Sequence, residues 1–181
     1  MQTSGEGTTV TEDFSLQGGL VVFDMLHENG ESNFIVELKD AESGETTESL
    51  ANEIGEWMGV YPMFAPDGEY FLEIDADGDW EFVITQPRPA PSEAEPTPVS
   101  GSDEFPNYLG LIRFEGVTNV RGEYSGEGNF AVWLLNGDGQ RVDLLFNEIG
   151  EFEGETTISE EGTGYLRVEA TGSWTVEARQ R

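Results

Sequence analysis

The chain has 181 residues, with 37 acidic and 8 basic side chains and a formal net charge of −29. It has no Cys and a single His, His27, which excludes a disulfide scaffold, a thiolate metal site, a cysteine nucleophile and a His-rich metal centre. No apolar run in the sequence approaches the roughly 20 residues that a membrane-spanning helix needs. A charge this negative repels phosphate backbones, so no nucleic acid is expected as a partner.

The acidic composition does not indicate disorder, because the chain also contains four Trp, eleven Phe and five Tyr. A folded acidic chain with a single Lys resembles the proteins of extreme halophiles. In molar salt the repulsion between carboxylates is screened within about 3 Å. We expect the acidity to serve solubility in salt rather than a particular reaction. The alternative is an acidic surface that binds one cationic partner.

The chain begins with a small, polar segment and is divided near its middle by a proline-rich one. Residues 1–12 predict a flexible leader. Residues 87–104 hold five of the eight prolines and no aromatic residue, which predicts an extended acidic linker that does not pack. We therefore expect one folded unit over residues 13–86 and a second over residues 105–181.

The two predicted units match each other in sequence. The four residues N-E-I-G occur in both, and Phe and Trp positions before and after them also match. The matched pairs, with their offsets, are Phe34 and Phe130 (96), Asn52 and Asn147 (95), and Trp80 and Trp174 (94). A period this long predicts two whole domains that arose by duplication rather than solenoid repeats.

Both units are expected to be β-structure, because apolar and polar residues alternate with a period of two. Dipeptides such as Asn29-Gly30 and Asp138-Gly139 indicate tight turns between the strands. The clearest alternating segments are Leu72–Ala76, Trp80–Ile84, Leu166–Ala170 and Ser173–Arg179. The predicted fold class is all-β, with two tandem antiparallel β-sandwich domains of jelly-roll-like form.

The second unit ends with G-Y-x-x-V-x-A-x-G-x-W at Gly164–Trp174, after N-F-x-V-x-L and N-E-I-G. This order resembles the bacterial and archaeal pre-peptidase C-terminal domains, which are compact sandwich modules of secreted proteins and surface lipoproteins. The resemblance covers both units but not the leader or the linker. It implies an accessory module at a cell surface. No lipid-anchoring Cys is present, so an anchor would have to lie upstream of Gln2.

Three carboxylates in one predicted turn, Asp75, Asp77 and Asp79, are the candidate metal ligands. Clustered carboxylates are what a hard cation such as Ca²⁺ requires. The spacing does not fit an EF-hand, and the second unit has Glu169, Thr171 and Ser173 at the matching positions. We therefore favour a solvated turn, with no cofactor expected.

The repeated N-E-I-G segments, Asn52–Gly55 and Asn147–Gly150, have two interpretations. A repeated Asn-Glu pair could bind a ligand twice. The interpretation we favour is a turn in which Gly takes a positive φ, with Ile54 and Ile149 packed into the core.

One face of the second unit differs in polarity from its counterpart in the first. If Asp138-Gly139 is a two-residue hairpin turn, Trp133 pairs with Leu144, Ala131 with Phe146, and Leu135 with Val142. These six apolar side chains then share one face. Their counterparts in the first unit are mostly polar: Glu37, Ser49, Ile35, Ala51, Lys39 and Thr47. Exposed apolar faces mark contacts, so we expect the first domain or another copy of the chain to cover this one. The alternative is that this face is the ordinary core and the register is one residue off.

The expected function is a non-enzymatic, extracytoplasmic or cell-surface interaction module that contacts other protein surfaces. A polysaccharide-binding module is the alternative. Enzyme activity comes third, because acidic residues are so abundant that no carboxylate pair stands out and His27 has no matching nucleophile.

Overall fold

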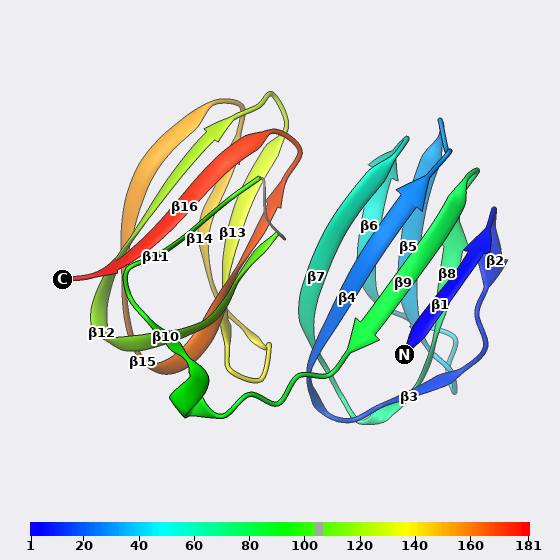
Figure 1. Cartoon of the computed structure of the whole chain (residues 1–181), viewed down its shortest axis with the longest axis horizontal. Coiled ribbons are helices and arrows are strands. Elements are labelled where there is room, and N and C mark those ends of the chain that lie inside the picture. The colour runs from blue at the N-terminus through cyan, green and yellow to red at the C-terminus, as the bar shows by residue number, and fades with distance from the viewer. Residues whose placement is uncertain (104–106) are drawn as a thin grey trace. The chain divides into compact units, whose positions relative to one another are not determined.

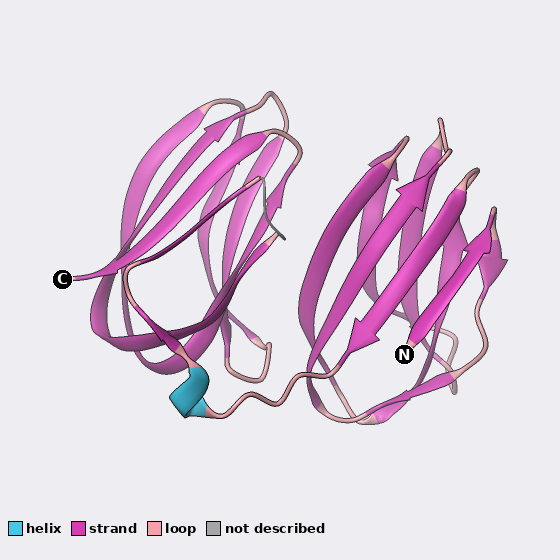
Figure 2. Cartoon of the chain, viewed as in Figure 1, coloured by secondary structure: helices cyan, strands magenta, loops and turns pink. Residues whose placement is uncertain are grey.

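The computed structural model describes residues 1–103 and 107–181. The described chain is built almost wholly of strands, with a short 3₁₀ turn, η1, at Pro91–Glu93 (Figures 1 and 2). It divides into two compact units: unit 1 comprises Met1–Tyr61 and Ala65–Pro87, and unit 2 comprises Arg88–Arg181 together with Pro62–Phe64. The prediction of an all-β fold with antiparallel sheets is confirmed. Within the described residues, no helix is long and apolar enough to cross a membrane.

Unit 1 is a sandwich of two sheets. One sheet has the strand order β1-β9-β4-β7, and the other has the order β2-β8-β5-β6, with β3 also paired to β8 (Figure 1). The strands are β1 (Gln2–Glu6), β2 (Thr9–Val10), β3 (Phe14–Leu16), β4 (Gly19–Glu28), β5 (Asn33–Asp40), β6 (Thr46–Ile54), β7 (Trp57–Ala65), β8 (Gly68–Asp75) and β9 (Asp79–Thr85).

The core of unit 1 follows from the alternation seen in the sequence. In β9, Trp80, Phe82 and Ile84 are buried, while Asp79 and Thr85 are exposed. Phe34 of the other sheet lies 6.3 Å from Phe82, measured between ring centroids. The two sheets therefore bury their apolar faces against each other, which is the main source of stability in a sandwich.

Unit 2 is a second sandwich, with the strand order β11-β16-β12-β15-β13-β14 and with β10 paired to β12. Its strands are β10 (Glu95–Pro96), β11 (Val99–Ser102), β12 (Tyr108–Ser125), β13 (Asn129–Asn136), β14 (Arg141–Ile149), β15 (Phe152–Ala170) and β16 (Ser173–Gln180). The long strand β15 pairs with β12 along most of its length and with β13 through its last residues. It therefore continues from one layer of the sandwich into the other.

The predicted leader is wrong, because residues 1–12 supply strands to both sheets of unit 1. β1 pairs with β9, and β2 pairs with β8. The small residues of the segment allow a large one to pack: a Cβ added at Gly5 would lie 2.4 Å from the Trp80 ring. The Trp80 indole N–H also donates to the Gly7 carbonyl oxygen at 3.0 Å. Backbone pairing thus orders a segment whose side chains carry no strand pattern.

The predicted unpacked linker is also wrong over most of its length. After η1, β10 pairs in parallel with β12 and β11 pairs antiparallel with β16. Ala94 is buried, and Val99 packs against the core of unit 2. The segment is extended, as its prolines predict. Its backbone N–H and C=O groups nevertheless pair with strands β12 and β16 of unit 2. The predicted boundary between residues 104 and 105 lies outside the described residues.

Candidate functional site

The pairing of β13 with β14 decides which side chains share the candidate interaction face. Trp133 pairs with Leu144, as predicted. The register then shifts on both sides of this pair, between Val132 and Trp133 and again between Leu134 and Leu135. Such shifts are β-bulges, each of which inserts one residue on one strand and reverses the side-chain alternation beyond it.

The bulges remove two residues from the predicted face. Phe146 pairs with Val132 rather than with Ala131, and it belongs to the core of unit 2, where its ring lies 5.1 Å from that of Phe152. Val142 is the extra residue of the second bulge, since Leu135 pairs with Arg141 instead. The prediction that all six side chains share one face is therefore wrong for Phe146 and Val142.

The remaining four residues lie on the side of β13 and β14 that faces away from the core. Phe130, Val132 and Leu134 belong to the core cluster, so the intervening side chains point the other way. Ala131 and Leu135 are buried there, whereas Trp133 and Leu144 are half-buried. The face open to solvent is therefore narrower than the sequence predicted.

Trp133 has arginine side chains beside its ring. The guanidinium carbon of Arg141 lies 5.0 Å from the ring centroid, and that of Arg167 lies 6.0 Å from it. Arg167 also donates from Nη2 to Glu169 Oε1 at 2.5 Å. Cation–π contacts of this kind contribute about 0.5–2 kcal/mol, depending on solvation. We define the Trp133 face as Trp133, Leu144 and the exposed Arg141.

The corresponding face of unit 1 is polar, although its strands pair in the same way. Glu37 pairs with Ser49, and β5 and β6 shift register at the matching two places. Lys39 Nζ lies 3.2 Å from Glu37 Oε2 and 2.9 Å from Glu73 Oε2. The hydrogen bond from the Lys39 ammonium group to Glu73 is the largest cause that raises the pKa of Lys39, and its hydrogen bond to Glu37 is the second. The two units therefore share backbone geometry but present different chemistry at this face.

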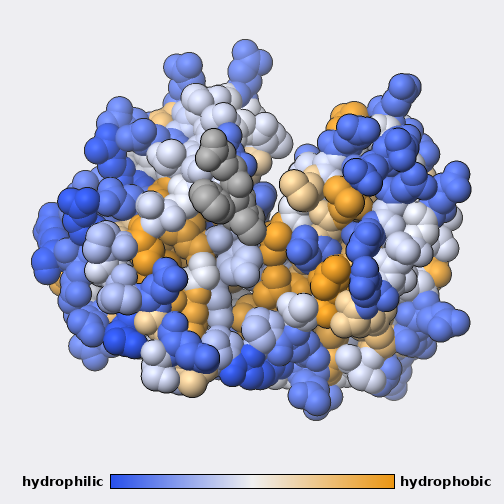
Figure 3. Space-filling view, in the orientation of Figure 1, coloured by the Kyte–Doolittle hydropathy of each residue, from blue (hydrophilic) through white to orange (hydrophobic). Residues whose placement is uncertain are grey.

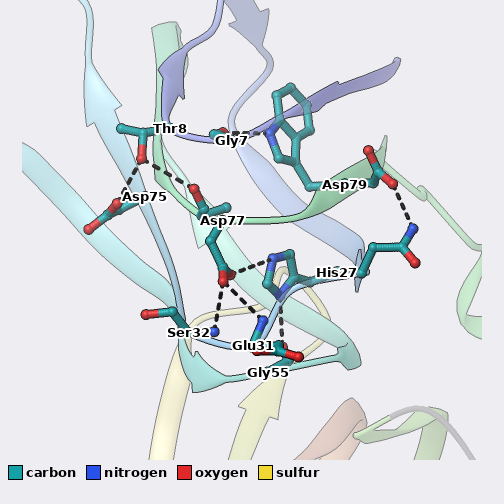
Figure 4. Close-up of polar contacts among 12 residues, drawn as sticks. Gly7, Thr8, His27, Glu31, Ser32, Gly55, Asp75, Asp77 and Asp79 are labelled. Atoms are coloured by element: carbon teal, nitrogen blue, oxygen red, sulfur yellow. Dashed lines mark hydrogen bonds and ion pairs between the residues drawn. The ribbon is translucent and has the colours of Figure 1, made fainter.

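The three aspartates of the candidate metal site are held by separate donors (Figure 4). Asp75 Oδ1 accepts from the Thr8 hydroxyl at 2.8 Å, and Asp79 Oδ2 accepts from Asn29 Nδ2 at 2.7 Å. Asp77 Oδ2 accepts from two backbone N–H groups, those of residues 31 and 32, each at 3.0 Å. Within the part of the chain that is described, no three acidic, His or Cys side chains are grouped to hold a metal ion. Instead, the three carboxylates accept hydrogen bonds that connect their turn to residue 8 and to the β4–β5 turn.

The turn around Asp77 also holds the single histidine, to which the sequence alone assigned no role. His27 is fully buried and stacks on Phe34, with 4.5 Å between ring centroids and 5° between planes. Its Nδ1 donates to the Gly55 carbonyl oxygen at 2.7 Å, and its Nε2 lies 3.8 Å from Asp77 Oδ1. The available signal was its inward position after Phe23 and Met25 in the alternation of β4.

Unit 2 has a similar arrangement at the same end. Tyr124 stacks on Phe130, with 5.1 Å between ring centroids and 6° between planes. Tyr124 pairs with Trp174 across the sheet, as His27 pairs with Trp80. The Tyr124 hydroxyl lies 3.5 Å from Thr171 Oγ1. This end of each sandwich is therefore closed by a polar ring stacked on a core phenylalanine.

The N-E-I-G segments form turns, but their isoleucines do not pack into the core. Gly55 and Gly150 have φ values of 78° and 83°. Their N–H groups donate to the carbonyl oxygens of residues 32 and 128, at 2.8 and 3.0 Å. Ile54 is 78% exposed and Ile149 is 84% exposed, so the prediction that they fill the core is wrong. Each isoleucine is the last residue of an edge strand and projects from the sandwich.

A hollow lined by acidic and aromatic residues lies at the turn end of unit 2. It has a volume of about 450 Å³ and is lined by residues that include Glu123, Glu151, Phe152 and Trp174. A similar hollow of about 380 Å³ in unit 1 includes Glu6, Glu28 and Trp80. Hydrophilic side chains cover most of the molecular face drawn in Figure 3, in keeping with the net charge of −29.

No family model matches the chain, and no curated protein matches it. Among solved structures, the chain is similar to one described as the PBSX exported protein XepA. The two are 10% identical, the match covers 98% of this chain and 83% of that one, and the TM-score is 0.28. A score this low carries no argument about function. The resemblance to pre-peptidase C-terminal domains remains a prediction.

Proposed function

We propose that this protein is a non-enzymatic interaction module that works outside the cytoplasm in concentrated salt and binds protein through its Trp133 face. The observation that carries the proposal is the grouping of Trp133, Leu144 and Arg141 outside the core of unit 2, at 5.0 Å between the Arg141 guanidinium carbon and the indole centroid. Trp and Arg are the residue types that dominate binding energy in protein interfaces. Unit 1 has the same strand pairing with the polar residues Glu37 and Ser49 at this position, so the fold itself does not require Trp133 and Leu144 there.

A polysaccharide ligand is the second candidate, because sugars stack on exposed aromatic rings. Two arginines already lie beside the Trp133 ring, at 5.0 and 6.0 Å from its centroid. A sugar would have to displace a guanidinium to stack there. The geometry therefore favours protein as the ligand.

The proposed source, origin and location of the module are argued from composition, from the similarity of the two units and from the resemblance stated above. The excess of 37 acidic over 8 basic residues supports a halophilic source. Matching bulges in β5–β6 and β13–β14, together with the matching N-E-I-G turns, support an origin by duplication. A secreted or surface location is proposed from the resemblance to pre-peptidase C-terminal domains.

The test is the molar mass in solution, measured by light scattering in molar salt for the wild type, Trp133→Glu and Leu144→Asp. We expect the wild type to associate and both variants to be folded monomers by circular dichroism. Val117→Glu is the control, since Val117 is 43% exposed on β12 of the same unit. Unfolding by both face variants, or association unchanged in both, would overturn the proposal. Retention of a monomeric wild type, but not of Trp133→Glu, on a polysaccharide matrix would establish the second candidate instead.

A further inference from the structure

Two Asn-Gly dipeptides occur in the chain, and the structure constrains them to different degrees. Asn29-Gly30 follows β4, and Asn136-Gly137 lies at the end of β13. Asparagine is among the thermolabile residues of proteins, and it is most labile before glycine, which has no side chain to hinder attack by its backbone nitrogen. Which of the two dipeptides reacts in the folded protein depends on how freely each asparagine side chain can rotate.

The reaction is a deamidation that consumes only water. The backbone nitrogen of the glycine attacks the side-chain carbonyl carbon, Cγ, of the asparagine, and the new C–N bond closes a succinimide ring. The bond from Cγ to Nδ2 breaks, and Nδ2 leaves as ammonia together with the proton of the glycine N–H. Water then adds to either ring carbonyl and opens the ring. The products are aspartate, with the original backbone, and isoaspartate, whose backbone runs through the former side chain.

Hydrogen bonds hold the Asn136 side chain in place. Its Oδ1 accepts from the N–H groups of Asp138 and Gln140, at 3.0 and 2.9 Å, and its Nδ2 donates to Gln140 Oε1 at 3.0 Å. Its backbone is bonded as well: the N–H donates to the Gln140 carbonyl oxygen, and the carbonyl oxygen accepts from the Gly139 N–H, each at 2.9 Å. Rotation of this side chain toward Gly137 therefore breaks three hydrogen bonds.

Asn29 is held by a single side-chain hydrogen bond. Its Nδ2 donates to Asp79 Oδ2 at 2.7 Å, and among the described residues its amide has no other partner. Both side chains are exposed. Asn29 also has a φ of 58°, a left-handed conformation that costs free energy for a residue with a side chain. Gly30 is buried against His27, so attack requires this turn to open, and relief of the positive φ favours that opening.

We infer that Asn29 is the residue of this chain that deamidates in the folded protein. One side-chain hydrogen bond restrains Asn29, whereas three restrain Asn136. The two additional bonds at Asn136 should make conversion of Asn29 faster by about tenfold. The site belongs to unit 1 and the Trp133 face to unit 2, so the reaction does not depend on the proposed function.

Deamidation at Asn29 loosens unit 1. The Asn29 amide donates to the Asp79 carboxylate, whereas either product places a second carboxylate there and replaces an attraction with a repulsion. Isoaspartate also lengthens the backbone by one carbon just before residues 31 and 32. The N–H groups of those two residues donate to Asp77 Oδ2, so the added carbon disturbs the turn that contacts His27.

The test is peptide mapping by mass spectrometry after incubation of the full chain in molar salt at mildly alkaline pH, both folded and in urea. In urea we expect Asn29 and Asn136 to be converted at similar rates, because the dipeptide is the same. In the folded protein we expect Asn29 to be converted about tenfold faster. Asp79→Ala removes the partner of the Asn29 amide and should speed its conversion several-fold. Asp75→Ala is the control, since this exposed aspartate of the same turn bonds to Thr8 instead.

Conversion of Asn136 as fast as Asn29 in the folded protein would overturn the inference, and so would an Asp79→Ala variant that reacts no faster than Asp75→Ala. The effect on unit 1 is tested with Asn29→Asp, which should have a lower urea midpoint than the wild type. Asn52→Asp adds the same charge at another exposed asparagine of unit 1 and should leave the midpoint unchanged. Equal midpoints for the two variants would show that the charge at Asn29 does not loosen the unit.

Discussion

The imidazole Nδ1 of His27 donates a hydrogen bond to the carbonyl oxygen of Gly55 at 2.7 Å, and so joins the end of β4 to the N-E-I-G turn between β6 and β7. Because a carbonyl oxygen only accepts, the hydrogen of this bond lies on Nδ1. The other ring nitrogen faces Asp77, which in turn accepts from the backbone of the β4–β5 turn. One buried ring therefore connects three turns at this end of unit 1 (Figure 4).

Replacing His27 should loosen this end of unit 1. His27→Ala removes a fully buried ring, its stacking on Phe34 and its hydrogen bond to Gly55. We expect a loss of about 2–4 kcal/mol in the free energy of unfolding, measured by urea denaturation. Hydrogen exchange should rise in β4 and in the Gly55 turn. Glu28→Ala, at the exposed neighbouring position, is the control, and equal stability of the two variants would contradict the role assigned to the ring.

The glycines of the N-E-I-G turns, Gly55 and Gly150, should be sensitive to substitution because of their positive φ. Gly150 has a φ of 83°, and no atom lies within 4 Å of a Cβ added there. Gly150→Ala should therefore cost about 1–2 kcal/mol of unfolding free energy without any steric clash. Gly110→Ala is the matched control, since its added Cβ also meets nothing within 4 Å and its φ is not positive. A Gly150→Ala variant as stable as Gly110→Ala would argue against the positive-φ turn.

Glu53 should contribute a pH dependence to stability. Burial raises the pKa of its carboxyl group above the ordinary value. The folded state therefore disfavours the charged form, and the stability linked to this group is full below the unfolded pKa and is lost as pH rises through the folded pKa. Glu53→Gln should remove this loss and raise the urea midpoint at neutral pH but not in acid. Glu148→Gln, at the exposed matching position of unit 2, should leave the midpoint unchanged at both. A Glu53→Gln midpoint that is unaltered at neutral pH would refute the prediction.

The first strand should prove essential to unit 1. A Cβ at Gly5 would lie 2.4 Å from the buried Trp80 ring, so Gly5→Val forces β1 or Trp80 to move. We expect a cost of about 1–3 kcal/mol in the free energy of unfolding and a change in Trp fluorescence. Ser4→Val, which places the same side chain on the next residue of β1, should have little effect. If Gly5→Val also has none, the segment is not held against Trp80 as described.

The sequence predicted those features that depend on short-range patterns. Alternation in Trp80–Ile84 and in Leu166–Ala170 identified strands and their inward side chains. The pairing of Trp133 with Leu144 was also predicted, but the turn is longer than the two residues assumed: the Asn136 N–H donates to the Gln140 carbonyl oxygen, and the bulge at Val142 restores the predicted register. The polar character of the corresponding face in unit 1 was also apparent from Glu37 and Lys39. These features require only the period of a strand and the conformational preference of glycine in a turn.

By itself, then, the sequence determined that this protein is all-β, acidic and composed of two similar units with N-E-I-G turns. Only the tertiary structure decided that Phe146 faces the core, that Ile54 and Ile149 face solvent, and that residues 1–12 pair with β9 and β8. The physical reason is the same in each case. A bulge reverses alternation by one residue, and backbone N–H and C=O groups pair regardless of side chain, so neither leaves a periodic signal in the amino-acid pattern.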